Sequence, residues 1–160
     1  MMMCADLFGA DPDDVDGYVA TGSSESNACA IRWACETFSS APFIGGENMH
    51  FSIKRAIKVV GRELLQVKAE KGGEMDIDAL GRGLAGCRDQ GVSEVCVMLV
   101  CGTTMGEAHD NIDAAIKSSM PRAMIANTVT STLTVPTAGL SCRFSKTLIR
   151  AFVWTFGVRG

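Results

Sequence analysis

The sequence predicts an α/β fold in which a mainly parallel sheet is flanked by helices. Two observations predict it. Helical stripes of apolar residues alternate with short apolar strands at the spacing of βαβ units. The run from Val95 to Val100 is apolar at every position, as in a strand that is covered on both faces. With 160 residues, 47% of them hydrophobic, the chain is long enough for one domain with a substantial core.

The first half of the chain carries two helical stripes with an extended piece between them. The first stripe follows Gly22 and consists of Ala28, Ile31, Cys35 and Phe38, spaced three or four residues apart. The extended piece runs from Pro42 to Ile44. The second stripe ends at Gly61, a natural helix stop, and consists of Ile53, Ala56, Ile57 and Val60.

The elements that follow continue the alternation. A short strand is expected at Leu64, Leu65 and Val67, before the polar turn that contains Gly72 and Gly73. Asp76 can cap a third helix, whose apolar stripe is Ile77, Leu80, Leu84 and Cys87. The buried strand from Val95 to Val100 comes next.

Composition excludes several classes of partner. The net charge of -3 arises from 15 basic and 18 acidic residues mixed along the chain, so no basic stripe for nucleic acid is present. The longest apolar run, Val95 to Cys101, is far shorter than the roughly 20 residues of a membrane span, and we expect neither a membrane span nor a signal peptide. The seven cysteines form no CxxC pair, which indicates reduced thiols in a cytoplasmic protein. His50 and His109 fit no metal-ligand spacing, and we expect no metal site.

Three small polar loops should meet at the carboxyl ends of the strands, where parallel sheets bind ligands. They contain Gly22 to Ser24, Glu47 to His50, and Gly102 to Thr104. The first could bind a phosphate at a helix start, although serines there are more often caps. His50 could be an acid, a base or a platform for a ring, although a lone histidine at a helix start is more often a surface cap. The third could reach a ligand or merely form a turn.

Four ordered stretches, taken together, resemble one family. They are Ala5 to Asn27 (ADLFGADPDDVDGYVATGSSESN), Asn48 to Ala56 (NMHFSIKRA), Gly73 to Leu80 (GEMDIDAL) and Gly102 to Asp113 (GTTMGEAHDNID). Their order resembles the group II pyridoxal-phosphate (PLP) decarboxylases, especially the histidine and serine decarboxylase branch. The resemblance implies that residues 1–117 are part of the PLP-binding large domain of a fold-type-I PLP-dependent transferase.

The resemblance also implies an activity and a set of site residues. The activity is that of a carboxy-lyase of amino-acid metabolism, which converts a small-molecule amino-acid substrate to an amine and CO2 with pyridoxal 5'-phosphate as cofactor. Gly22, Ser23 and Ser24 match the loop that holds the cofactor phosphate. His50 matches the catalytic histidine that stacks on the pyridine ring, and Thr103 matches a threonine beside the cofactor. The intact family member is expected to be a homodimer or a higher oligomer.

The chain departs from the family after the GTT segment. The aspartate that pairs with the pyridine nitrogen and the lysine that holds the cofactor covalently are both missing, and neither Lys117 nor Lys146 matches that lysine. We therefore expect an incomplete and inactive fragment. Two alternatives stay open: another fold-type-I PLP enzyme, such as an aminotransferase or a desulfurase, and a non-catalytic decayed copy that binds an intact subunit.

Residues 118–160 are expected to form a divergent tail with little regular structure. From Ser119 to Ser145 the tail is rich in Thr, Ser and Ala, and neither helical nor strand periodicity persists. Across Cys142 to Thr147 a shifted reading frame permits Pro-Phe-Leu-Glu-Asp, which resembles the family's continuation. This suggests a frameshift near Asn127 to Leu133, a hypothesis that the encoding DNA would decide.

Overall fold

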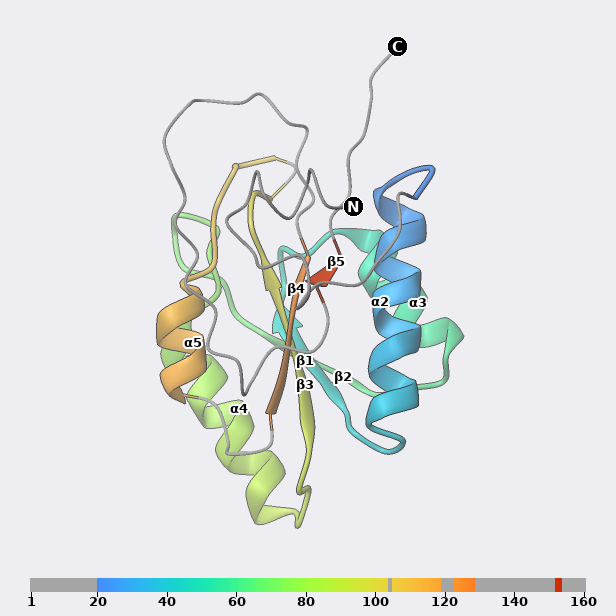
Figure 1. Cartoon of the computed structure of the whole chain (residues 1–160). Helices are drawn as coiled ribbons and strands as arrows, with labels where there is room; N and C mark the ends of the chain where they lie inside the picture. Colours follow the sequence, from blue (N-terminus) through green and yellow to red (C-terminus); the bar gives the residue numbers. More distant parts are fainter. Residues whose placement is uncertain (1–19, 104, 119–122, 129–151, 154–160) are drawn as a thin grey trace.

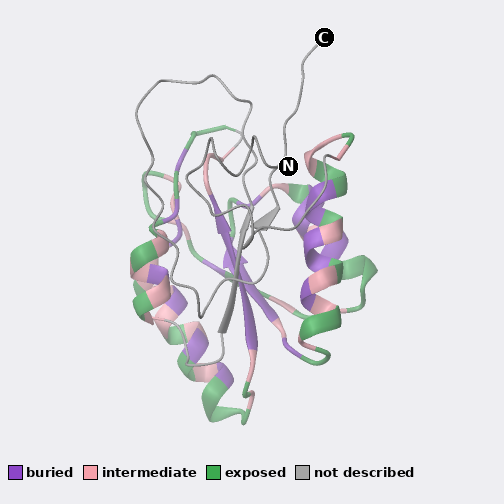
Figure 2. Ribbon diagram, in the orientation of Figure 1, coloured by how far each residue is buried: buried purple, intermediate pink, exposed green. Residues whose placement is uncertain are grey.

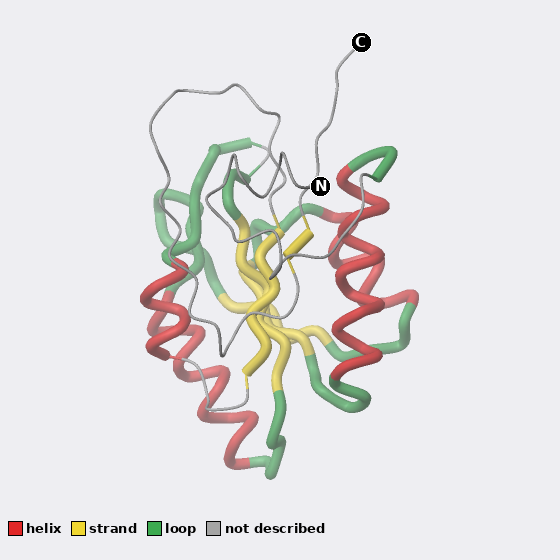
Figure 3. The backbone as a smooth tube through the Cα atoms, in the orientation of Figure 1, coloured by secondary structure: helices red, strands yellow, loops and turns green. Residues whose placement is uncertain are grey.

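The computed structural model describes residues 20–103, 105–118, 123–128 and 152–153. A five-stranded sheet with parallel pairing throughout forms the centre of this part (Figures 1 and 3). Its strands are β1 (Phe43–Gly46), β2 (Leu64–Val67), β3 (Val95–Val100), β4 (Ala123–Thr128) and β5 (Phe152–Val153), in the spatial order β2-β1-β3-β4-β5. The predicted parallel α/β architecture is confirmed.

Helices cover both faces of the sheet. The helices are α2 (Ser23–Thr37), α3 (Phe51–Val59), α4 (Ile77–Asp89) and α5 (Ile112–Ser118). Figure 1 shows α2 and α3 on one side of the strands and α4 and α5 on the other. Each strand from β1 to β3 is followed by a helix that returns the chain to the start of the next strand, so the connections are βαβ crossovers.

The central strand β3 has two buried faces, as its continuous apolar run predicts. Successive side chains of a strand point to opposite faces, and the two hydrophobic clusters divide β3 in this way. Cys96, Met98 and Val100 pack in the cluster with α2 and α3. Val95, Val97 and Leu99 pack in the cluster with α4 and α5. Figure 2 shows the resulting buried centre and the exposed outer faces of the helices.

The predicted helix boundaries follow from local chemistry. Asp76 is the N-cap of α4, and its Oδ1 accepts a hydrogen bond from the backbone N–H of Ala79 at 2.9 Å. α3 ends at the C-cap Val60, and Gly61 follows with a φ of 70°, a conformation that favours glycine. Both the predicted cap and the predicted stop are confirmed.

The buried face of α2 differs from the predicted stripe. Ala28 is exposed and Cys35 and Phe38 are only half-buried, whereas the buried residues of α2 are Ser26, Asn27, Ala30, Ile31 and Ala34. Ile31 is buried, and Cys35 and Phe38 pack against the core as predicted. The prediction is wrong for Ala28 because it followed apolar residues alone, and this face contains a polar contact: the Asn27 side chain donates to Ser52 of α3 at 2.9 Å. The small Ala30 and Ala34 complete the face.

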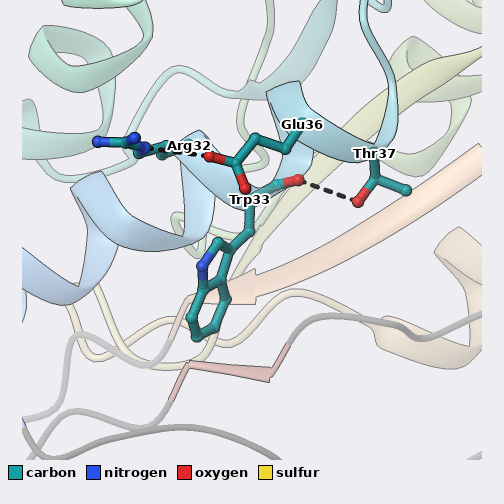
Figure 4. A network of polar contacts seen from close by, with 4 residues as sticks. All are labelled: Arg32, Trp33, Glu36 and Thr37. Carbon is teal, nitrogen blue, oxygen red and sulfur yellow. Dashed lines mark hydrogen bonds and ion pairs between the residues drawn. The ribbon is translucent and has the colours of Figure 1, made fainter.

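The outer face of α2 carries polar contacts within the helix (Figure 4). Arg32 Nε lies 3.1 Å from Glu36 Oε1, one turn along the exposed surface. The Thr37 hydroxyl donates to the Trp33 carbonyl at 3.0 Å, and the Trp33 ring points away from the ion pair. Exposed pairs of this kind contribute at most about 0.5 kcal/mol to stability, so they mark the solvent face rather than hold the helix in place.

The expectation of little regular structure after residue 118 is wrong for two segments of the tail. All six residues of β4 pair in parallel register with β3, from Val95 with Ala123 to Val100 with Thr128. β5 adds two further pairs at the edge of β4. Strand pairing satisfies backbone N–H and C=O groups whatever the side-chain pattern, which is why a search for side-chain periodicity missed both strands. The rest of the tail, including Lys146, lies outside the described residues, as do residues 5–19 of the first matching stretch.

Candidate functional site

A cavity opens at the carboxyl end of the sheet between the loops that follow β1 and β3. The chain leaves β1 toward β2 on one side, and it leaves β3 toward β4 on the other, so these two loops diverge. Such a switch point is where open parallel sheets form ligand crevices. The cavity has a volume of about 420 Å³, within the range of small-molecule sites. Its lining residues are Asn48, His50, Gly73, Thr103, Met105 and Gly106.

His50 lies at the rim of this cavity because it is the N-cap of α3. Its Nδ1 accepts a hydrogen bond from the backbone N–H of Ser52 at 3.3 Å and lies 2.8 Å from the Ser52 hydroxyl oxygen. The Phe51 ring packs against the imidazole at a centroid distance of 4.3 Å with an interplanar angle of 43°. The capping bonds hold the ring at a defined angle, and Phe51 occupies one side of it.

Thr103 enters the cavity from a closed loop after β3. Gly102 has a φ of 93°, which favours glycine, and it turns the chain out of the strand. The Thr103 Oγ1 accepts a hydrogen bond from the backbone N–H of Ala108 at 3.1 Å, and the Thr103 N–H donates to the Ala108 carbonyl at 3.0 Å. Because the oxygen already accepts a bond inside the loop, the hydroxyl proton is directed toward other acceptors. The neighbouring Thr104 lies outside the described residues.

The predicted phosphate loop is at the start of α2, which lies at the same end of the sheet as the carboxyl end of β3 (Figure 1). Gly22 is the N-cap of α2, and no side chain caps the helix. The first N–H groups of the helix and the hydroxyls of Ser23 and Ser24 are therefore suited to an anion. Gly22, Ser23 and Ser24 are not among the residues that line the cavity, so the structure brings His50 and Thr103 together but leaves this loop beside them.

Glu25 shapes that loop. Its Oε2 accepts hydrogen bonds from the Thr21 hydroxyl at 2.6 Å and from the Thr21 N–H at 2.8 Å. The bonds from the hydroxyl and the backbone of Thr21 lower the pKa of the Glu25 carboxyl, so the side chain is ionised at neutral pH. Glu25 thus folds the residues before α2 back onto the first turn.

Two residues that sequence reasoning did not single out tie the cavity loops together. The Asp110 carboxylate is buried, with 8% exposure, and accepts hydrogen bonds of 2.7 Å from the backbone N–H groups of Met75 and Val100. Asn48 donates to the Gly73 carbonyl at 3.2 Å. Loops from three strands are joined in this way. The sequence carried no signal for the Asp110 contacts, because the partners of this buried carboxylate are backbone groups.

The described part of the chain contains neither a reactive buried thiol nor a cluster of metal ligands. Burial raises the pKa of the Cys96 thiol to about 12 and raises that of Cys87, so both are protonated and unreactive at neutral pH. The described residues contain no group of three or more His, Cys, Asp or Glu side chains that could hold a metal ion. No helix in the described ranges is long and apolar enough to cross a bilayer.

The residues present fit PLP in their chemistry. The uncapped start of α2 offers N–H groups and hydroxyls for a phosphate dianion. The imidazole of His50 offers a flat surface for an aromatic ring, and the Thr103 hydroxyl offers a donor for a ring substituent. The glycines Gly73 and Gly106 keep two walls of the cavity free of side chains. No lysine of the described part of the chain lines the cavity, so this set lacks a group that would bind covalently to the cofactor.

The proteins with similar sequences are amino-acid decarboxylases. Histidine decarboxylase of Pseudomonas entomophila is 29% identical over 112 residues, which cover 70% of this chain and 27% of that protein. Aromatic-L-amino-acid decarboxylase of Bacillus atrophaeus is 26% identical over 110 residues, 64% of this chain and 23% of that protein. No family model matches the chain. The chain thus spans about a quarter of the length of these relatives.

Solved structures share the fold. Mouse CSAD in its apo form superimposes with a TM-score of 0.68 at 20% identity, over 79% of this chain and 30% of that chain. Tryptophan decarboxylase of Catharanthus roseus, solved with L-tryptophan, gives a TM-score of 0.65 at 17% identity, over 79% and 31%. The fold is therefore that of a fold-type-I PLP enzyme. Together with the sequence matches, it makes the chain similar to part of the length of the group II PLP-dependent decarboxylases.

Proposed function

We propose that this chain is a cofactor-binding segment of a PLP-dependent amino-acid decarboxylase, a carboxy-lyase that converts an amino acid to an amine and CO2. The observation that carries the proposal is the meeting of His50 and Thr103 at one cavity, at the carboxyl ends of β1 and β3, with the uncapped start of α2 at the same end of the sheet. The decarboxylase names of the sequence relatives support the reaction class.

Each residue has a distinct part in this proposal. Gly22, Ser23 and Ser24 hold the cofactor phosphate through backbone N–H groups, hydroxyls and the positive end of the α2 dipole. His50 stacks on the pyridine ring from the side opposite Phe51, and Thr103 donates its hydroxyl proton to a ring substituent. PLP, when bound, supplies the electron sink for loss of CO2, while these residues fix its orientation.

We further propose that the 160-residue chain is inactive alone. The described lysines do not line the cavity, and Lys54 donates to the Glu47 carbonyl at 2.8 Å instead. β4, with the sequence AMIANT, carries no acidic residue that could pair with the pyridine nitrogen. A non-catalytic copy that only binds cofactor or an intact subunit is the alternative that these absences favour.

The remaining expectations belong to the same proposal. Residues 1–117 constitute part of the large domain, and 118–160 the divergent tail. The intact protein acts as a homodimer or higher oligomer on a small-molecule amino-acid substrate, as the resemblance implies. A cytoplasmic location fits the protonated, buried Cys87 and Cys96, which need no oxidising compartment.

The proposal is tested by calorimetric titration with pyridoxine 5'-phosphate, which lacks the aldehyde and therefore cannot react with surface lysines. We expect weak binding to the wild-type chain. Replacing Ser23 and Ser24 together by leucine should abolish it, because the phosphate loses several charge-assisted hydrogen bonds. His50→Ala should weaken it only about twofold to twelvefold, since ring stacking contributes about 0.5 to 1.5 kcal/mol.

A matched control is the double replacement of Ser39 and Ser40 by leucine. These serines are exposed just beyond the other end of α2, so the control changes the same residue types away from the site. It should bind like the wild type. The reverse order of effects, or normal binding by the Ser23/Ser24 variant, would mean that the phosphate does not bind at the start of α2.

A further inference from the structure

Three polar side chains form a line from the interface of α2 and α3 to the cavity. Asn27 of α2 has its amide nitrogen 2.9 Å from the Ser52 hydroxyl oxygen, which in turn lies 2.8 Å from His50 Nδ1. Asn27 is fully buried and Ser52 is 7% exposed, while His50 lines the cavity. The line therefore connects a buried amide to a ring at the proposed cofactor site.

The direction of these hydrogen bonds follows from the backbone. The N–H of Ser52, 3.3 Å from His50 Nδ1, can only donate, so Nδ1 must accept. The Ser52 hydroxyl then donates to the same Nδ1 rather than accepting from it. Its oxygen is left to accept from the Asn27 amide N–H, which agrees with the orientation of that amide. All three bonds run toward the imidazole.

This direction decides which ring nitrogen carries the proton. With the Nδ1 lone pair engaged by Ser52, a neutral His50 ring carries its proton on Nε2, on the far side of the ring from Ser52. We propose that Asn27 and Ser52 are positioning residues that fix His50 as the Nε2–H tautomer, a hydrogen-bond donor to an anionic ligand oxygen rather than a base. The ligand part rests on the proposed function.

The burial of Asn27 supports a role beyond packing. Its Oδ1 is buried and has no hydrogen-bond partner in the described part of the chain. Burying an unsatisfied polar atom costs free energy that an apolar side chain of similar size would avoid. If the amide were reversed, its nitrogen would be the unsatisfied atom, and its oxygen would accept the proton of the Ser52 hydroxyl. The hydroxyl could then only accept from Nδ1, although Nδ1 already accepts from the backbone N–H of Ser52. The hydrogen bond from the Asn27 amide nitrogen to Ser52 therefore gives a reason for a polar side chain at this buried position.

Nitrogen NMR of the ring tests the proposal directly on the 160-residue chain, without cofactor. The chain contains only two histidines, so His109→Gln assigns the spectrum of His50. At a pH of about 8.5, where an ordinary histidine is neutral, we expect a pyridine-type signal from Nδ1 and a pyrrole-type signal from Nε2. A predominant Nδ1–H form in the wild-type chain would overturn the proposal, and no variant is needed for that outcome.

Variants then identify the residues that hold the tautomer. Ser52→Ala keeps the 3.3 Å bond from the backbone N–H but loses the shorter bond from the hydroxyl, so it should raise the fraction of Nδ1–H. Ser52→Thr, which keeps the hydroxyl, should restore the wild-type ratio. Asn27→Asp should also raise it, because a carboxylate accepts the Ser52 proton and turns Ser52 into an acceptor for the ring. Ser26→Ala, at a neighbouring buried serine of α2 outside the line, is the control and should change nothing.

The outcomes of this test and of the cofactor titration are separate. If the ring ratio in correctly folded Ser52→Ala and Asn27→Asp equals that of the wild type, the positioning role is wrong, whatever binds in the cavity. If the variants shift the ratio as expected but pyridoxine 5'-phosphate does not bind, the tautomer is fixed by Asn27 and Ser52 and only the proposed function fails.

Discussion

Asp110 joins the loop after β3 to the segment before α4 through its two carboxylate oxygens. Each oxygen accepts a 2.7 Å hydrogen bond from a buried backbone N–H group, one of Met75 and one of Val100. Asp110→Ala leaves both groups without a partner. We expect the free energy of unfolding to fall by about 2 to 4 kcal/mol, measured by urea denaturation, with His109→Ala at the exposed neighbour as a control that changes it little. A loss below about 0.5 kcal/mol would contradict this role.

The pH dependence of the same residue has a definite sign. Burial raises the pKa of the Asp110 carboxyl, and the N–H groups of Val100 and Met75 offset only part of that effect. The folded chain therefore keeps the proton at a pH where the unfolded chain has lost it, so this contribution to stability is complete below about pH 4 and is lost as pH rises through the raised pKa. Compared with Asp110→Asn, which cannot titrate, the wild type should lose stability over that window. If the wild type instead gains stability relative to Asp110→Asn as the pH rises, the pKa of Asp110 is not raised in the folded chain.

At the scale of single elements, we expect replacement of glycine by alanine to have opposite effects on stability at two positions. An added Cβ at Gly81 of α4 meets nothing within 4 Å, so Gly81→Ala should raise the thermal stability by about 0.5 to 1 kcal/mol through the lower entropy of the unfolded chain. At Gly45 of β1 it would overlap the Met49 side chain and lie 3.2 Å from Met98 Cβ, so Gly45→Ala should cost about 1 to 3 kcal/mol. Equal shifts from the two would refute the packing of β1 against β3.

The elements up to the end of β3 were predictable because each has a local signal. Asp76 and Gly61 mark helix ends by their own chemistry, and the run from Val95 to Val100 marks a strand that is buried on both faces. β4 was not predictable from its side chains, because its place beside β3 is established by backbone pairing across 28 residues of sequence (95 to 123).

The candidate site was predictable only in part. His50 and Thr103 could be placed at one edge because loops after parallel strands meet there. The partners of His50 could not, since Asn27 and Ser52 meet through the packing of two helices rather than through any spacing in sequence. Asp110 was likewise missed because its partners are backbone groups of Met75 and Val100, which leave no trace in residue type.

For the whole molecule, we expect no decarboxylation by the isolated chain. None of the described lysines lines the cavity where the cofactor would bind, so turnover should fail even where cofactor binds. The assay measures CO2 and amine release from histidine, serine and aromatic amino acids, with PLP alone as the control. Release above that control would refute inactivity, and keto-acid or sulfide formation instead would favour an aminotransferase or a desulfurase.

The central claim is that the cofactor site lies at the carboxyl edge of the sheet, between the loops after β1 and β3 and beside the start of α2. Amide NMR shifts of the chain on titration with pyridoxine 5'-phosphate test it most directly, with pyridoxine, which lacks the phosphate, as the matched ligand. We expect shifts at Gly22 to Ser24, His50 and Thr103, and much smaller shifts at Gly22 to Ser24 with pyridoxine. Shifts concentrated at the opposite edge, around Gly91 to Ser93 before β3, would contradict it.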